Sequence, residues 1–326
     1  MHLFSIIVPV HNGEKTLAQC LKAIIKIKGF EKCELIVAND GSTDSSFKIA
    51  QKYSDKVVSN QVNKGAAATR NIGAQAAQGK FLLFIDDDVI LSSRNILKYI
   101  KEDFKSSDIC GVFGVYDEKI AFNDFFSAYK HLYMSYGKLT SKRLNQTADS
   151  AMMAIPRESY LAAGGFNEKY LGAMAEDIEF SIRFSLKENK PFLQDSRITG
   201  IHYQKHNFKS LCKTNRSRIK GIAKTIQKED YRKVYLKMSK SSSGKPLFPM
   251  ILTIGFLILS LFYPLALLGL LISFILFALV QVGLFKYIRR KRGFIFALSS
   301  VGFSFIEMFI ALVFASYYQL YYKLKK

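Results

Sequence analysis

The chain has 326 residues, of which 49% are hydrophobic, and its formal net charge is +21. This length accommodates one large catalytic domain plus a further segment, and the strong positive charge favours anionic partners such as nucleotides and phospholipids. The four cysteines, Cys20, Cys33, Cys110 and Cys212, are scattered without metal-ligand spacing, which argues against a disulfide-stabilised fold and favours a reducing compartment.

The first hundred residues alternate between strand and helix patterns. Strands are expected at residues 3–10, 33–40, 56–60 and 80–86, and helices at 14–27, 43–53 and 65–78. The first apolar run has only eight residues and no basic leader, so we expect a buried strand there, not a signal peptide. Strands that alternate with helices predict a parallel, doubly wound α/β sheet.

Polar residues follow three of these strands, at Asn12, at Asn39-Asp40 and at residues 86–88. Doubly wound sheets bind ligands beyond the carboxyl ends of their strands. Asp86 and Asp88 stand two apart on a segment that we expect to be extended, so their side chains would point the same way. Two hard oxygen donors suit Mg²⁺ or Mn²⁺, which would hold a nucleotide diphosphate. The alternative is a solvated acidic turn.

The middle of the chain is harder to interpret. A fifth strand is expected at 108–116, an amphipathic aromatic helix at about 122–138, and a turn "GGFN" before a helix that begins near Ala175. His202 and His206 are four residues apart and would share one face of a helix.

Residues 205–245 form a basic tract with thirteen Lys and Arg against two acidic residues. Apolar residues recur within it near helical spacing, which predicts a basic amphipathic helix at an anionic phospholipid surface. A solvated charged helix and a nucleic-acid-binding patch are the alternatives. The apolar segments that follow favour the membrane, so we expect no nucleic-acid partner.

Residues 247–285 contain no charged side chain. A span needs roughly 20 residues, so we expect two, at 247–263 and 265–285. The basic stretch 286–292 should be cytoplasmic, which places the catalytic domain on that side of a multi-pass cell-membrane protein. Residues 294–322 would form a third span, or a re-entrant or interfacial hairpin that keeps the C-terminal lysines on the cytoplasmic side. Glu307 is costly at membrane depth and should face a headgroup, a polar groove or the interface.

Four segments together resemble the family 2 glycosyltransferases: "SIIVPVHNGEKTL", "ELIVANDGSTDSS", "NKGAAATRNIGAQAAQGKFLLFIDDDV" and "GGFNEKYLGAMAEDIEFSIR". Their order and spacing match over about residues 3–205. The resemblance implies a GT-A (Rossmann-like) catalytic domain at 1–204 that transfers sugars with inversion. The basic segment 205–246 and a transmembrane region at 247–326 would follow it.

The resemblance also implies site residues. Those expected at the nucleotide-sugar donor are Pro9, Asn12, Asp40, Lys64, Arg70, Asp86 and Asp87. Asp40 would accept a hydrogen bond from the imide of uracil, and Asn39 departs from the aspartate usual in the family. Asp86 would lie nearer the ribose and Asp88 on the metal, while Asp87 would face away or towards the ribose. The expected metal set is Asp86, Asp88 and His202.

The resemblance assigns the general base to Asp177, with Glu176 beside it. An acid-rich helix N-terminus, favoured by the helix dipole, is the structural alternative. The Gln-x-x-Arg-Trp motif of processive synthases is missing, because the sequence contains no tryptophan. Transfer of one or a few sugars is therefore expected.

Together these features predict an inverting glycosyltransferase that depends on Mn²⁺ or Mg²⁺. It would move a sugar from a nucleotide donor, with UDP favoured, to a lipid-linked or membrane-associated acceptor in cell-surface glycan synthesis. One alternative is a membrane protein with an inactive GT-A domain that serves a binding or structural role. A sugar nucleotidyltransferase would need a Gly-rich basic loop after the first strand, and "HNGEKT" matches that poorly.

Overall fold

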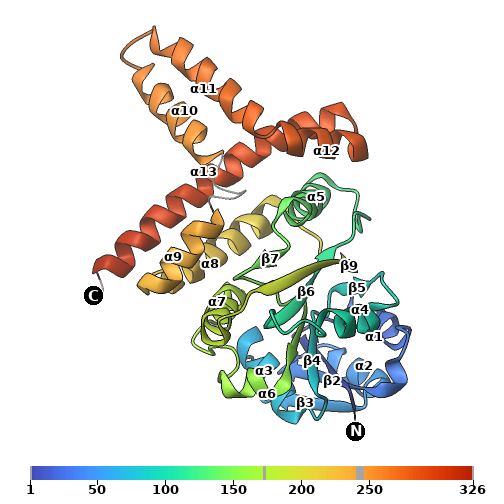
Figure 1. Cartoon of the computed structure of the whole chain (residues 1–326). Coiled ribbons are helices and arrows are strands. Elements are labelled where there is room, and N and C mark those ends of the chain that lie inside the picture. Colours follow the sequence, from blue (N-terminus) through green and yellow to red (C-terminus); the bar gives the residue numbers. More distant parts are fainter. Residues whose placement is uncertain (1, 172–173, 240–245, 325–326) are drawn as a thin grey trace.

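A computed structural model describes residues 2–171, 174–239 and 246–324 of the chain. An α/β domain forms one end of the molecule, and the C-terminal helices project from one side of it (Figure 1). The strands are β1 (Phe4–Val10), β2 (Cys33–Asp40), β3 (Lys56–Asn60), β4 (Phe81–Ile85), β5 (Val89–Leu91), β6 (Gly111–Tyr116), β7 (Leu144–Asn145), β8 (Met152–Pro156) and β9 (Phe192–His202). The helices of the α/β domain are α1 (Leu17–Ile25), α2 (Ser46–Tyr53), α3 (Ala66–Ala76), α4 (Ile96–Asp103), α5 (Phe125–Thr140), α6 (Arg157–Ala162) and α7 (Glu176–Glu188), with a 3₁₀ turn at Phe30–Lys32.

The described strands form one sheet in the order β3-β2-β1-β4-β8-β6-β9-β5, with β7 beside β9. Strands β3, β2, β1 and β4 are parallel, as predicted. Strand β8 then runs antiparallel between β4 and β6, and β9 returns parallel to β6. The sheet is therefore mostly parallel, and the predicted fold class is confirmed.

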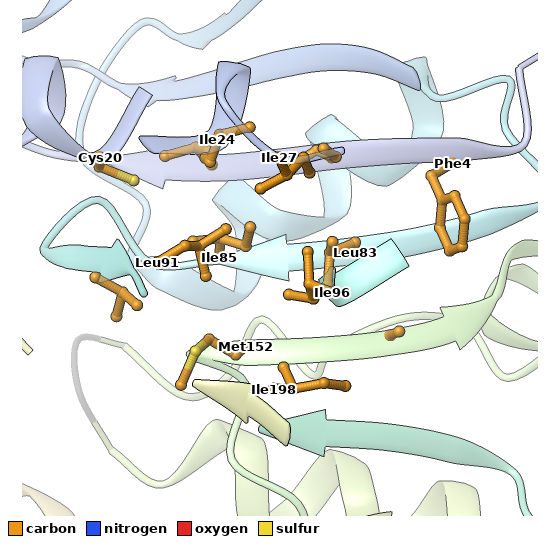
Figure 2. Close-up of a cluster of buried hydrophobic side chains, with 14 of the residues drawn as sticks. Phe4, Cys20, Ile24, Ile27, Leu83, Ile85, Leu91, Ile96, Met152 and Ile198 are labelled. Atoms are coloured by element: carbon orange, nitrogen blue, oxygen red, sulfur yellow. The ribbon is translucent and has the colours of Figure 1, made fainter. Parts of the chain in front are cut away.

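Helices cover both faces of the sheet, so its central strands are buried on both sides. In β4, Leu83 and Ile85 face one apolar cluster while Leu82 and Phe84 face the other. This is the two-residue alternation of a strand. Figure 2 shows Leu83 and Ile85 beside Ile24 of α1 and Ile96 of α4. Full burial of one such side chain contributes about 1.5–3 kcal/mol, which explains why "FLLFI" is apolar at every position.

Three features between β8 and α9 correct or add to the elements expected from the sequence. His202 is the last residue of strand β9, and His206 lies in the non-helical segment 203–207 that follows. The two histidines therefore do not share one face of a helix. Strands β8 and β9 are absent from the elements expected from the sequence. The basic tract forms two helices, α8 (Phe208–Thr225) and α9 (Glu229–Ser239).

The C-terminal region also differs from the expected pattern of spans. Helices α10 (Leu247–Leu259) and α11 (Ala266–Val280) have 13 and 15 residues, fewer than the roughly 20 that a span requires. Helix α12 (Val282–Arg292) follows α11 with a bend of 63°. Helix α13 (Phe294–Leu324) is one continuous helix of 31 residues, without the chain reversal of a hairpin. Its placement relative to a membrane stays a prediction. Among the described residues, α13 alone is a single helix long and apolar enough to cross a membrane, and the bent α11–α12 pair could count as a second. The expected multi-pass arrangement is therefore not supported.

Glu307 in the middle of α13 faces the catalytic domain. Its Oε2 accepts a hydrogen bond from Tyr129 Oη at 2.7 Å. Its Oε1 accepts from Lys130 Nζ at 2.9 Å and from Asn215 Nδ2 at 2.8 Å. The carboxylate is thus bound by polar side chains of α5 and α8.

Candidate active site

A cavity of about 340 Å³ lies at the carboxyl ends of β1, β2 and β4. It is lined by Pro9, Val10, His11, Asp40, Asn63, Gly65, Ala66, Thr69, Arg70, Asp86, Asp87, Asp88 and Glu176. The strand-end position is where a doubly wound sheet binds its ligand. Of the predicted donor-site residues, Pro9, Asp40, Arg70, Asp86 and Asp87 line this cavity.

Arg70 links two of the predicted carboxylates. Its Nη2 contacts Asp86 Oδ1 at 2.7 Å, and its Nη1 contacts Glu176 Oε1 at 3.0 Å. The side chains of Arg70 and Glu176 are only 5% and 8% exposed. Helix α3 places the guanidinium here because its small residues Ala67 and Ala74 pack directly on the sheet. Arg70 therefore holds the N-terminus of α7 against the end of β4.

Residues 86–88 form a turn, not the extended segment expected from the sequence. The turn is closed by a hydrogen bond from the Val89 amide to the Asp86 carbonyl at 3.0 Å. Since strand alternation does not apply in a turn, Asp86 and Asp88 take different partners. Asp86 meets Arg70, whereas Asp88 Oδ2 stands 3.3 Å from His202 Nε2. Asp87 lies against Gly13, where a Cβ atom would come within 2.0 Å of its Oδ2.

Asp88 and His202 meet because β5 pairs with the end of β9. Val89 is opposite His202, and the Tyr203 amide donates to the Asp88 carbonyl at 2.7 Å. The His202 ring stacks on Tyr116, with ring centroids 4.9 Å apart. Burial opposes the charge on both groups, but their mutual attraction lowers the pKa of Asp88 and raises that of His202.

The structure does not bring the three predicted metal ligands together. Within residues 2–171, 174–239 and 246–324, no group of three or more His, Cys, Asp or Glu side chains is arranged to hold a metal ion. Asp86 is held by Arg70, which leaves Asp88 and His202 as an oxygen–nitrogen pair. His206 lies beside His202, with ring centroids 6.4 Å apart.

Asp40 fixes the loop that forms one wall of the cavity. Its Oδ1 accepts hydrogen bonds from Asn60 Nδ2 at 2.7 Å and from the Lys64 amide at 2.9 Å. Its Oδ2 accepts from the Gly65 amide at 2.8 Å. Gly65 has φ of 90°, a left-handed value that favours glycine. The carboxylate is thus largely engaged by the protein itself, and its contact with a base stays a prediction.

The remaining predicted donor residues lie at the rim. Asn12 has φ of 54° and accepts through Oδ1 from the Thr43 amide at 2.8 Å, joining the loops after β1 and β2. Lys64 contributes its backbone amide to the Asp40 contact, while the residue itself is exposed. These contacts give both residues structural roles at the entrance.

Asp177 follows Glu176 at the start of α7 and has partners that sequence reasoning missed. Arg218 of α8 places Nη2 4.0 Å from Asp177 Oδ2. Burial raises the pKa of Asp177 most, while Arg218 opposes that shift and Asp149 adds to it. Although burial opposes its ionisation, Lys138 and Arg218 lower the pKa of Asp149 to about 2. Asp149 and Arg218 therefore belong to the charged surroundings of Asp177.

No sequence signal singled out these two residues. Asp149 is a lone carboxylate in an unassigned loop, and Arg218 is one of thirteen cations in the basic tract. Only the packing of α8 beside α7 brings Arg218 to Asp177.

This sheet, with carboxylates gathered at its strand ends, defines a GT-A domain. Residues 5–161 match the family model "Glycosyl transferase family 2". Residues 5–161 therefore form a family 2 glycosyltransferase domain.

The chain is also similar in sequence to curated proteins of glycan synthesis. The chain is 34% identical over 118 residues to the minor teichoic acid biosynthesis protein GgaB of Bacillus subtilis (strain 168), which is 33% of this chain and 13% of that protein. It is 33% identical over 119 residues to glycosyltransferase GlyG of Streptococcus pneumoniae serotype 4, which is 35% of this chain and 39% of that protein. The chain thus spans less than half the length of these relatives.

A solved structure shares the fold over most of the chain. The mannosyltransferase PcManGT from Pyrobaculum calidifontis, solved in complex with GDP-Man and Mn²⁺, matches with a TM-score of 0.60 and 14% identity. The match covers 93% of this chain and 87% of PcManGT. At this identity the likeness shows the GT-A fold alone.

Proposed function

We propose that the chain is an inverting, metal-dependent glycosyltransferase on the cytoplasmic face of a cell membrane. It transfers a sugar from a nucleotide donor, with UDP favoured, to a lipid-linked acceptor in cell-surface glycan synthesis. The observation that carries this proposal is the double contact of Arg70 with Asp86 and Glu176. It joins the donor side of the cavity to the helix that carries Asp177.

The cell-surface role is supported by the relatives, one of which is named for teichoic acid biosynthesis. The acceptor proposal is supported by the basic helix α8, which reaches the site through Arg218 and packs along the apolar helix α13. A membrane-bound acceptor would therefore meet both the apolar surface and the candidate base.

Asp88 and His202 fit a divalent cation that completes its coordination with substrate phosphates and water. Mg²⁺ is commonly held by one or two carboxylates plus phosphates, and imidazole adds a ligand that Mn²⁺ accepts. Such an ion would stabilise the charge that develops on a leaving diphosphate. Asp86 is already neutralised by Arg70 and has a positioning role.

The other steps of the proposed reaction are assigned to residues of the chain. Asp40 and Gly65 hold the loop that bounds the donor cavity. Arg70 orients Asp86 and Glu176. Asp177 takes the proton from the acceptor hydroxyl as that oxygen attacks the anomeric carbon. Arg218 keeps Asp177 more acidic than burial alone would make it.

The test is release of nucleotide from UDP-, GDP- and dTDP-sugars by the purified full-length chain, with Mn²⁺ or Mg²⁺ and with or without membrane lipid extract. We expect metal-dependent release from one donor. Asp88→Ala should raise the metal requirement by at least about ten- to hundredfold, the loss typical of residues that merely support a metal ligand. Asp108→Ala, which alters an exposed aspartate, is the matched control.

Release only in the presence of lipid supports a membrane acceptor. No release from any donor, by folded protein with lipid present, favours the alternative of an inactive domain with a binding role. Equal activity of Asp88→Ala at limiting metal contradicts the metal site.

Arg218 should lower the pH below which the enzyme loses activity, because it lowers the pKa of Asp177. Asp177 acts as a base only when it is ionised, so activity falls as pH drops through its raised pKa. Arg218 lowers that pKa, and Arg218→Gln should therefore move the acid limb of kcat to higher pH. The measurement is a kcat–pH profile of Arg218→Gln beside Lys220→Gln, a neighbouring exposed cation on α8. An unmoved limb in Arg218→Gln rules out this electrostatic role.

A further inference from the structure

Helix α13 is long enough to cross a membrane, but its contacts with α5 of the catalytic domain and with α8 of the basic segment extend along its length. Phe296 packs on Phe125 with ring centroids 5.2 Å apart, and further along the helix Phe303 packs on Tyr129 at 4.9 Å. Tyr318 accepts a hydrogen bond from Arg216 at 3.2 Å. Residues 296 to 318 cover about 33 Å of helix at 1.5 Å per residue, which exceeds the roughly 30 Å of a bilayer's hydrocarbon core.

These contacts are incompatible with α13 as a span. Its partner helix α8 carries six Lys and Arg, and α8 packs extensively along α13. If α13 crossed the bilayer, α8 and its cations would be drawn into the hydrocarbon, where each charge is strongly unfavourable. The carboxylate of Glu307, bound by Lys130 and Asn215, would be carried in with them.

The free face of α13 is mainly apolar along its length. Eight of the ten exposed large apolar side chains of α13 recur at steps that fit one helical face, and they are Ile295, Leu298, Ile306, Phe309, Val313, Tyr317, Leu320 and Leu324. At 100° per residue this stripe lies about 120° from the side that carries Phe303, Glu307 and Tyr318. A third side packs on the α10–α11 hairpin through Val301 and its neighbours.

The hairpin extends the same apolar surface away from the catalytic domain (Figure 1). Helices of 13 and 15 residues are about 20 and 22 Å long, too short to cross. Their exposed side chains near the turn are apolar, including Leu261, Phe262 and Leu265. Exposed Arg289 and Arg290 follow the hairpin, and exposed lysines of α8 lie beside α13.

We propose that α13 lies in the plane of the membrane interface and that the α10–α11 hairpin dips into the same leaflet of an anionic phospholipid bilayer. No described segment then crosses the bilayer. The catalytic domain, residues 286–292 and the end of α13 all lie on one side. The basic residues meet anionic headgroups, and the stripe and the hairpin meet acyl chains. This inference deepens the membrane association proposed above and rests on it, but it needs no sugar transfer to be tested.

The first test asks on which side each end of α13 lies. Single cysteines are placed by Arg290→Cys and Lys323→Cys in a Cys212→Ala background, in which the three remaining cysteines are buried. Lys52→Cys on α2 reports the catalytic side. In sealed membrane vesicles of known orientation, a membrane-impermeant maleimide should label all three positions from the same side. Labelling of Lys323→Cys from the side opposite to Arg290→Cys overturns the proposal.

The second test measures depth and uses the absence of tryptophan from the sequence. Leu298→Trp, Phe309→Trp and Leu320→Trp each introduce one fluorophore on the exposed stripe. Their fluorescence is measured in vesicles of phosphatidylglycerol and phosphatidylcholine that carry bromine, a quencher, at defined acyl positions. The in-plane arrangement predicts quenching at the same shallow depth for all three tryptophans. Phe47→Trp on the exposed surface of α2 is the unquenched control.

A spanning helix gives another pattern, with Phe309→Trp deepest and the other two nearer opposite surfaces. That result overturns the proposal even if the enzyme is fully active. If all three tryptophans are quenched at the same shallow depth but no nucleotide is released, the in-plane arrangement is supported. Only the proposed activity is then contradicted.

Discussion

Asp177→Asn should reduce sugar transfer by about 10²–10⁴-fold, the range that general base catalysis contributes. The substitution removes the proton acceptor but keeps the shape of the side chain. The amide oxygen of the new side chain can still accept the hydrogen bond that the Ile178 amide donates at 2.8 Å, so α7 should begin as before. The loss should appear in kcat, with little change in the KM for the nucleotide donor, because Asp177 is outside the residues that line the donor cavity.

Glu179→Gln on the same helix is not a suitable control, because Glu179 is buried, with 3% of its side chain exposed, and its pairing with Arg183 at 3.0 Å would be lost inside the domain. Glu229→Gln, an exposed site in the i,i+4 pair with Lys233 on α9, alters a carboxylate away from the cavity. It should keep near-normal activity. Transfer by Asp177→Asn at more than about one tenth of the normal rate would exclude Asp177 as the base, since general base catalysis supplies at least about 10²-fold.

Arg70→Met should destabilise the domain by about 3–5 kcal/mol, the cost of removing one partner from a buried ion pair. Methionine fills much of the space, but it leaves Asp86 and Glu176 without the guanidinium that neutralises them. Donor binding should weaken as well, because α3 no longer ties the end of β4 to α7. The measurement is the urea midpoint of the purified chain by near-ultraviolet circular dichroism.

Two further variants separate electrostatics from packing. Arg70→Met combined with Glu176→Gln removes one unpaired carboxylate, so the double variant should recover part of the loss, as expected for residues in direct contact. Arg94→Met at an exposed position should change stability by no more than about 0.5 kcal/mol. Additive losses in the double variant would show that Arg70 stabilises the domain through packing instead.

The first half of the sheet was predictable because its strands are buried on both faces. Strand β1 is apolar or small at every position, and turn residues bound it. Strand β9 lacks such a pattern: residues 194–197 are polar, and its pairing with β6 shifts register near Phe113 and Val115. Strand β8 is short and apolar but lies next to a helix signal, so periodicity could not separate the two.

The site was predictable where a residue follows a buried strand and unpredictable where tertiary packing supplies it. Asp40, Asp86 and Asp88 fall at strand ends that the sequence indicates. The turn at 86–88 could not be foreseen, because the antiparallel pairing of Val89 with His202 that shapes it joins distant parts of the chain. Arg218 reaches Asp177 only through the packing of α8 on α7.

The insertion of β8 between β4 and β6 has a consequence for the order of folding. Strands β3, β2, β1 and β4 come from the first 85 residues, and each pairs with a near neighbour in sequence or with β1. This half can form early during synthesis, since its loops are short. Asp177, His202 and Arg218 come later in the chain, and β9 must pair with β6 across a segment that contains α5 to α7, which we expect to be the slower step. The wall of the cavity that Asp40 and Arg70 form would then exist before the proposed base, Asp177, joins the site.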